Sequence, residues 1–67
     1  MITYLIYDGR ATEENGTEDV TVLGTADSLQ EARDLIKNSG WGECYIWSYI
    51  DDFHSLEDET FIEKAEG

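Results

Sequence analysis

Residues 28–50, which read SLQEARDLIKNSGWGECYIWSYI, decide the fold of this chain. In the first half of the stretch, apolar residues recur at helical spacing, which predicts one buried stripe on a helix. The members of this stripe are Leu29, Ala32, Leu35 and Ile36. Asp27 or Ser28 can serve as the N-cap, and Ser28 followed by Glu31 fits a capping box. Gly40 is placed to end the helix in the left-handed conformation.

The second half, Glu43 to Ile50, alternates between two kinds of side chain, as is typical of a strand with two different faces. The small and aliphatic face holds Cys44, Ile46, Ser48 and Ile50. The aromatic face holds Tyr45, Trp47 and Tyr49. We expect the helix to cover the aliphatic face and the aromatic face to lie uncovered on the opposite side of the sheet.

Three further strands are expected outside this stretch. Ile2 to Tyr7 is uncharged and largely apolar on both faces, which favours a central strand. The Asn15-Gly16 pair is typical of a hairpin. Val20 to Thr25 and Thr60 to Lys64 have the β-branched and aromatic content of strands.

These elements predict a single α+β domain over residues 1–67. Its order is ββαββ, and a four-stranded antiparallel sheet in the order 2-1-3-4 carries the helix on one face. The crossover between the second and third strands then passes over the first. At this length a folded chain buries only roughly 60% of its unfolded surface, so the stability margin is small.

The charge balance limits what the chain can bind. Sixteen Asp and Glu residues face four Lys and Arg residues, for a formal net charge of −12. Phosphate contacts need cationic side chains in number, which argues against direct binding of nucleic acid or of anionic membranes. No apolar run approaches the ~20 residues of a membrane span. The first residues lack the basic region of a signal peptide, so we expect a cytoplasmic protein.

The acids gather in the connections and on the helix, whereas the strands are nearly uncharged. The residues that we expect to contact a partner are Glu13, Glu14, Glu18 and Asp19 in the first loop, Asp51, Asp52, Glu57, Asp58 and Glu59 in the second, and Glu31 and Asp34 on the helix. The two loops are expected at opposite ends of the sheet, about 20 Å apart. A string of carboxylates over that length can occupy a cationic nucleic-acid groove.

Groups that could carry chemistry are few. Cys44 is the one cysteine and His54 the one histidine. Acidic surroundings raise the pKa of a thiol, which opposes a reactive thiolate. The acids around His54 lack the spacing and central glycine of an EF-hand. We therefore predict no catalytic residue, no metal site and no cofactor.

In small size, acidity and lack of catalytic groups, the chain resembles the small proteins that phages use against bacterial defence, such as anti-CRISPR and anti-restriction DNA mimics. The resemblance is one of composition over the whole chain and rests on no motif. It implies an inhibitor that acts by binding a protein in the cytoplasm of a bacterial host.

Two hypotheses of function follow. The first is a non-catalytic inhibitor that presents a DNA-mimic-like acidic surface to a nucleic-acid-binding protein with a basic groove, such as a CRISPR-Cas or restriction component. The alternative is a small homodimeric adaptor or regulatory protein that binds through the face of Tyr45, Trp47 and Tyr49. In the alternative, the acidity serves only solubility or adaptation to a high-salt host.

Overall fold

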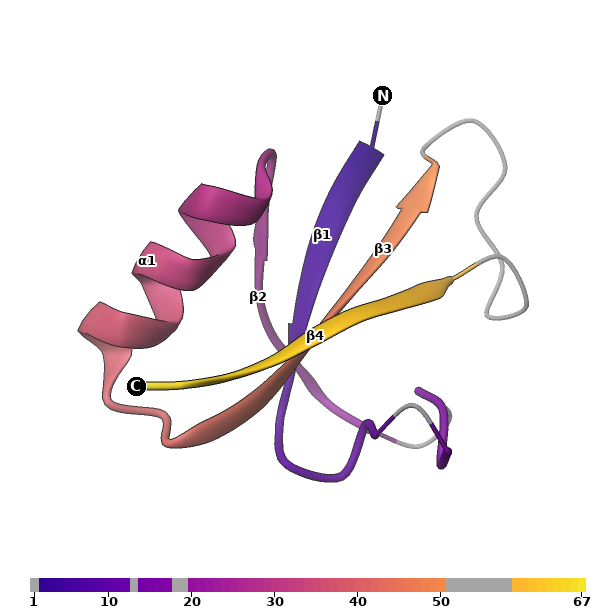
Figure 1. The fold of residues 1–67 in the computed structure, drawn as a ribbon, viewed down its shortest axis with the longest axis horizontal. Coiled ribbons are helices and arrows are strands. Elements are labelled where there is room, and N and C mark those ends of the chain that lie inside the picture. Colours follow the sequence, from indigo (N-terminus) through magenta and orange to yellow (C-terminus); the bar gives the residue numbers. More distant parts are fainter. Residues whose placement is uncertain (1, 13, 18–19, 51–58) are drawn as a thin grey trace.

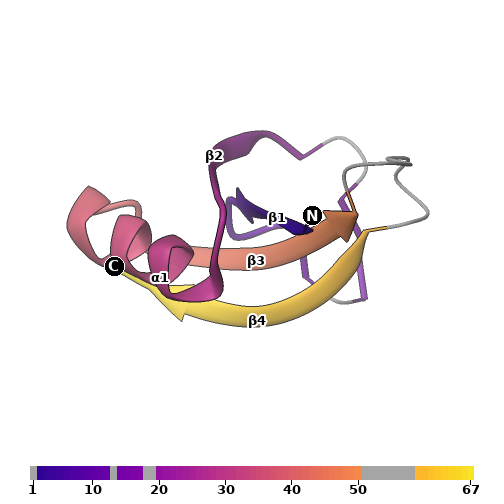
Figure 2. The ribbon, with the colours of Figure 1, turned by 90° about the horizontal axis from the view of Figure 1, so that it is seen from above.

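The computed structural model describes residues 2–12, 14–17, 20–50 and 59–67 (Figure 1). In chain order its elements are β1 (Ile2–Tyr7), β2 (Val22–Ala26), α1 (Leu29–Ser39), β3 (Glu43–Ile50) and β4 (Thr60–Glu66). The four strands form one antiparallel sheet in the order β2-β1-β3-β4. Figure 2 shows α1 beside this sheet, with β2 and β4 at its two edges. The predicted fold class and strand order are confirmed.

The strand bounds differ from the prediction at both ends of β2, which continues to Ala26 and not to Thr25, and at the end of β4. β2 begins at Val22, not at Val20, because the Val20 amide donates to the Thr17 carbonyl oxygen at 3.3 Å in a turn before the strand. β4 continues to Glu66, two residues beyond the predicted end. The bounds of β3 are those predicted.

The helix is capped as its sequence indicates. Ser28 has extended backbone angles and its hydroxyl accepts a hydrogen bond from the Glu31 amide at 3.1 Å, which satisfies one of the unpaired donors of the first turn. The Glu31 carboxylate in turn accepts from the amide of Asp27 at 3.2 Å, one residue before the expected partner. Gly40 ends the helix with φ of 75°, in the left-handed region that glycine adopts without strain.

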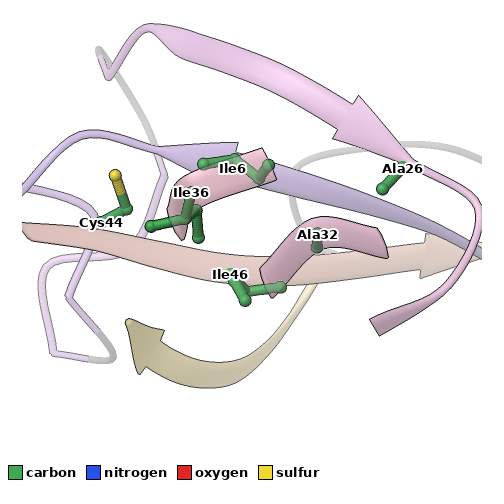
Figure 3. Packing of buried hydrophobic residues seen from close by; sticks show 6 residues of the cluster. All are labelled: Ile6, Ala26, Ala32, Ile36, Cys44 and Ile46. Carbon is green, nitrogen blue, oxygen red and sulfur yellow. The ribbon is translucent and has the colours of Figure 1, made fainter. Parts of the chain in front are cut away.

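The first core lies between α1 and the sheet. It contains Ile6, Ala26, Ala32, Ile36, Cys44 and Ile46, which Figure 3 shows gathered between the helix and the strands. The helix therefore covers the aliphatic face of β3, as predicted. Leu35 is 39% exposed, so its assignment to the buried stripe is wrong. The stripe is centred on Ala32 and Ile36, and Leu35 lies at its margin.

A second core lies on the opposite face of the sheet and corrects a prediction. Its buried members are Leu5, Tyr7, Ala11 and Trp47, with Val20, Tyr45, Tyr49 and Phe61 packed partly buried against them. Ala11 belongs to the connection between β1 and β2, whose described residues 8–12, 14–17, 20 and 21 we call the covering segment. The aromatic face is therefore not uncovered, because apolar residues of the covering segment fold back over it.

One hydrogen bond fixes the covering segment to the sheet. The indole Nε1 of Trp47 donates to the backbone carbonyl of Ala11 at 2.8 Å, and both groups are buried. A buried indole N–H needs such a partner. The sequence predicts only a hairpin loop before Val20 and a strand from Val20 onward, and no local pattern assigns Ala11 or Val20 to a second core.

Candidate functional site

Most of the predicted acidic contact residues lie outside the described part of the chain. These are Glu13, Glu18, Asp19, Asp51, Asp52, Glu57 and Asp58. Three of the remaining residues, Glu14, Glu31 and Asp34, are exposed. Glu59 is not, since only 8% of its surface is accessible. The prediction that Glu59 belongs to an exposed acidic surface is therefore wrong.

Glu59 is buried because two hydroxyl groups satisfy its carboxylate. Oε1 accepts a hydrogen bond from the Tyr7 hydroxyl at 2.5 Å, and Oε2 accepts one from the Thr17 hydroxyl at 3.2 Å. A buried carboxylate requires hydrogen-bond donors of this kind. Burial, and then the hydrogen bond and charge of Glu59, raise the pKa of the Tyr7 phenol well above its usual range.

This cluster also changes the expected arrangement of the two acidic loops. The sequence places them about 20 Å apart at opposite ends of the sheet. In the structure Thr17, from the first loop, hydrogen-bonds directly to Glu59, from the second, although the two residues are 42 positions apart in the chain. The covering segment therefore brings described parts of both loops into contact on one face.

The basic side chains mostly lie against acids. Arg33 on α1 forms a two-pronged pair with Glu63 on β4, at 2.9 Å from Nε and 2.6 Å from Nη2. The hydrogen bond from Arg33 lowers the pKa of Glu63 and raises that of Arg33. The other close pairs are Lys64 with Glu43 and Glu66, at 3.6 and 3.8 Å, and Arg10 with Asp8, at 3.5 Å. The net negative charge therefore comes from acids outside these pairs.

Three of those acids lie along α1 and just before it. We call Asp27, Glu31 and Asp34 the helix acids; all three are exposed. Glu31 accepts from the Asp27 amide, and Asp34 accepts from the neutral side chain of Gln30 at 3.0 Å. Among the described residues, no Lys or Arg forms an ion pair with any of the three. Their charge is therefore open to a cationic partner.

The two sheet edges differ in chemistry. β4 carries Glu63, Lys64 and Glu66, which oppose pairing with another strand. β2 carries neither charge nor proline. Exposed apolar side chains accompany β2: Val22 within it is 43% exposed, and Trp41, just after the helix, is 39% exposed.

Trp41 packs against the backbone of β2. A Cβ at Gly24 would lie only 3.2 Å from Cη2 of the Trp41 ring, so the absence of a side chain at Gly24 admits the indole. Glycine within a strand often marks such a close approach. The sequence signal for this contact is Gly24 inside a predicted strand, and no contact at this edge was predicted from it.

The predicted aromatic contact residues serve mainly as packing. Trp47 is 7% exposed, and its ring meets Phe61 edge-on, with ring centroids 5.6 Å apart. Tyr45 and Tyr49 are half-buried beside it. The Tyr45 hydroxyl donates to the Glu43 carboxylate at 2.9 Å, and this hydrogen bond raises the pKa of Tyr45. A partner could reach Trp47 only if the covering segment moved.

Cys44 is held in an unreactive setting. Cys44 is fully buried, and burial, followed by the charges of Asp8 and Glu43, raises the pKa of its thiol. A thiol with a raised pKa is a weak nucleophile at neutral pH. Over residues 2–12, 14–17, 20–50 and 59–67, no group of three His, Cys, Asp or Glu side chains is arranged to hold a metal ion. His54 lies outside those residues.

No protein-family model, curated protein or solved structure matches this chain. Inference about function therefore rests on charge, burial and geometry. Within the described part of the chain, no helix has the length and apolar character needed to cross a membrane.

Proposed function

We propose that this protein is a non-catalytic inhibitor that presents carboxylates to the Lys- and Arg-lined groove of a nucleic-acid-binding protein in the cytoplasm. The net charge is −12, and the observation that carries the proposal is which of the described acids have a cation beside them and which do not. Arg33, Lys64 and Arg10 lie against nearby acids, whereas the helix acids have no described cation beside them.

The physical role of such a surface is electrostatic. Concentrated negative charge speeds encounter with a positive groove and orients the two proteins before contact. The same charge destabilises a small fold through self-repulsion, which a binding function would justify. The compositional resemblance to small acidic phage proteins points to a CRISPR-Cas or restriction component as the partner.

The homodimeric adaptor hypothesis has less support. It needs an accessible face of Tyr45, Trp47 and Tyr49, and the covering segment lies over Trp47. Adaptation to a high-salt host remains a competing account of the charge, and it predicts no specific cationic partner.

The test is affinity capture from a bacterial lysate at low and high salt, followed by an assay of DNA binding by the captured protein. We expect a nucleic-acid-binding protein that is released by salt and whose DNA binding this protein blocks, since screening weakens contacts between exposed charges. In the variant Asp27→Asn/Glu31→Gln/Asp34→Asn, capture and inhibition should fall sharply.

The matched control is Glu43→Gln/Glu63→Gln/Glu66→Gln, which removes the same number of charges from acids already paired with Lys64 or Arg33. Circular dichroism establishes that both variants are folded. If both lose capture equally, only total charge matters. If the helix-acid variant inhibits as well as the unmodified protein, the helix acids are not the contact surface and the proposal is wrong.

A further inference from the structure

β2 is the less protected of the two sheet edges. Natural edge strands carry charges, proline or bulges that prevent a further strand from pairing with them. Both edge strands have a register irregularity, at Leu23 in β2 and at Ile62 in β4, so charge is what distinguishes them. β4 has such charges, whereas the sequence of β2, VLGTA, has neither charge nor proline. Alternate backbone N–H and C=O groups of an edge strand point away from the sheet and can pair with an added strand. β2 ends the sheet in the described structure.

The helix side of β2 offers a contact for side chains of an added strand. Gly24 pairs with Ile6, which belongs to the core beneath α1, so Gly24 lies on the helix side of the sheet. The indole of Trp41 lies against Gly24 and remains 39% exposed. A residue opposite Gly24 in an added strand would place its side chain beside this ring. An aromatic face attracts Lys and Arg more strongly than it attracts neutral side chains.

Two carboxylates lie beside the next position of β2 on the helix side of the sheet. Ala26 pairs with Tyr4 on the same helix side, two residues after Gly24. Asp27 follows directly, and the Glu31 carboxylate reaches its amide at 3.2 Å, which places both acids where β2 meets α1. Side chains at i and i+2 of a strand share a face. In an added strand, the side chain opposite Ala26 would therefore lie near the carboxylates of Asp27 and Glu31. The side chain opposite Gly24 would lie near the indole of Trp41.

We infer that β2 accepts an extended segment of a partner protein that carries Lys or Arg at alternate positions, paired edge to edge with Val22–Ala26. This inference rests on the proposed function and specifies how the cationic partner binds. Strand addition supplies main-chain hydrogen bonds for affinity, and the alternating cations supply specificity through Trp41 and the helix acids.

The test is an NMR titration of the isotope-labelled protein with a short peptide of alternating Lys and Thr, and with its Glu-Thr counterpart. We expect the Lys-Thr peptide to shift the backbone amide signals of β2 and the indole signal of Trp41, and to leave β4 unchanged. The Glu-Thr peptide should not bind.

N-methylated peptides separate strand pairing from simple charge attraction. Two Lys-Thr peptides, methylated at alternate backbone nitrogens in the two possible phases, keep all their charges. Only one phase points its N–H groups at β2, so methylation in that phase should abolish binding while the other phase binds. Equal binding by both methylated peptides, or shifts at β4 in place of β2, would overturn the inference.

Substitution of Trp41 tests the side-chain contact. We expect Trp41→Leu to weaken binding of the Lys-Thr peptide roughly 2- to 30-fold, the range that a cation–aromatic contact spans, and Trp41→Tyr to restore most of it. Unchanged affinity in Trp41→Leu would remove the indole from the site. If β2 signals move with protein concentration before peptide is added, a second copy occupies the edge and the inference is wrong.

These outcomes are distinct from those of the capture experiment. If a nucleic-acid-binding protein is captured and inhibited but the peptide leaves β2 unchanged, only the strand inference fails. If the peptide binds β2 but the captured proteins do not bind nucleic acid, the proposed function fails and the peptide site stands.

Discussion

The hydroxyl of Tyr7 donates a hydrogen bond to the carboxylate of Glu59, 2.5 Å away in space and 52 residues away in the chain. The Thr17 hydroxyl completes the site from the covering segment. One carboxylate, on the residue that precedes β4, thus joins that end of β4 to the central strand and to the covering segment. Most acids in the described part of the chain are exposed, whereas this one has a structural role.

Replacement of Glu59 by Gln should destabilise the fold. The amide keeps one oxygen acceptor but replaces the other with nitrogen, so one of the two hydroxyls loses the oxygen to which it donates, at a cost of about 1–3 kcal/mol for a buried, unsatisfied polar group. Urea unfolding measures the loss. Glu66→Gln removes the same charge from an exposed position and should change stability little. A fully stable Glu59→Gln protein that no longer binds its partner would instead make Glu59 a contact residue.

Replacement of Trp47 by Phe should loosen the covering segment around Ala11, although the hydrogen bond of Thr17 to Glu59 remains. The Ala11 carbonyl would lose its buried partner, at a cost of about 1–3 kcal/mol in the free energy of unfolding. The protein should also become more sensitive to proteolysis between residues 8 and 21, since local opening exposes backbone. The matched control, Trp41→Phe, makes the same change at a residue that is 39% exposed. Equal effects of the two variants would show that the Ala11 hydrogen bond does not hold the segment.

Stability should fall at alkaline pH because of Tyr7. Its pKa in the folded protein is raised above the ordinary value of 10.0, first by burial and then by Glu59. Above pH ~10 the unfolded chain releases the phenolic proton while the folded protein retains it, so the free energy of unfolding decreases as pH rises. Tyr7→Phe should flatten this decrease in urea unfolding at several pH values. Tyr45→Phe is the comparison variant: the hydrogen bond to Glu43 also raises the pKa of Tyr45, but its hydroxyl is exposed, so this variant should flatten the decrease less than Tyr7→Phe does. A slope unchanged by Tyr7→Phe would contradict the buried phenol.

The Arg33–Glu63 pair should make the stability of the fold depend on pH in the acid range. The hydrogen bond from Arg33 lowers the pKa of Glu63 in the folded protein, so this contribution is complete above the unfolded pKa of the carboxyl and disappears as pH falls through the folded value. Arg33→Gln should therefore make stability less dependent on pH in the acid range. Lys37→Gln, which removes a cation from the last turn of the same helix, is the control. The difference between the two variants should shrink in high salt, because both members of the pair are partly exposed.

Much of the fold was predictable because local signals agreed with the global arrangement. Ser28 and Gly40 mark the ends of α1, and the alternation of residues 43–50 gives the bounds of β3. The central position of β1 followed from its uncharged, two-sided apolar sequence, and the sheet confirms it.

The second core was not predictable from local pattern. The covering segment has no periodicity, and its contribution depends on single contacts, such as that of Ala11 with Trp47, between residues 36 positions apart. The burial of Glu59 has the same cause, because nothing beside it in the sequence reveals that Tyr7 and Thr17 will surround it. Non-local contacts of this kind decided which predicted acids and aromatic residues remain exposed.

The central position of β1 has a consequence for how the protein is made. β1 is translated before its two neighbours, yet it must pair with β3, and Ile2 meets Ile50 at the far end of that ladder. Until β3 has left the ribosome, a nascent chain holds an uncharged apolar strand with one side unpaired, and such strands readily associate with other chains. The acids between β1 and β3 would then protect the nascent chain through mutual repulsion, before any partner is met.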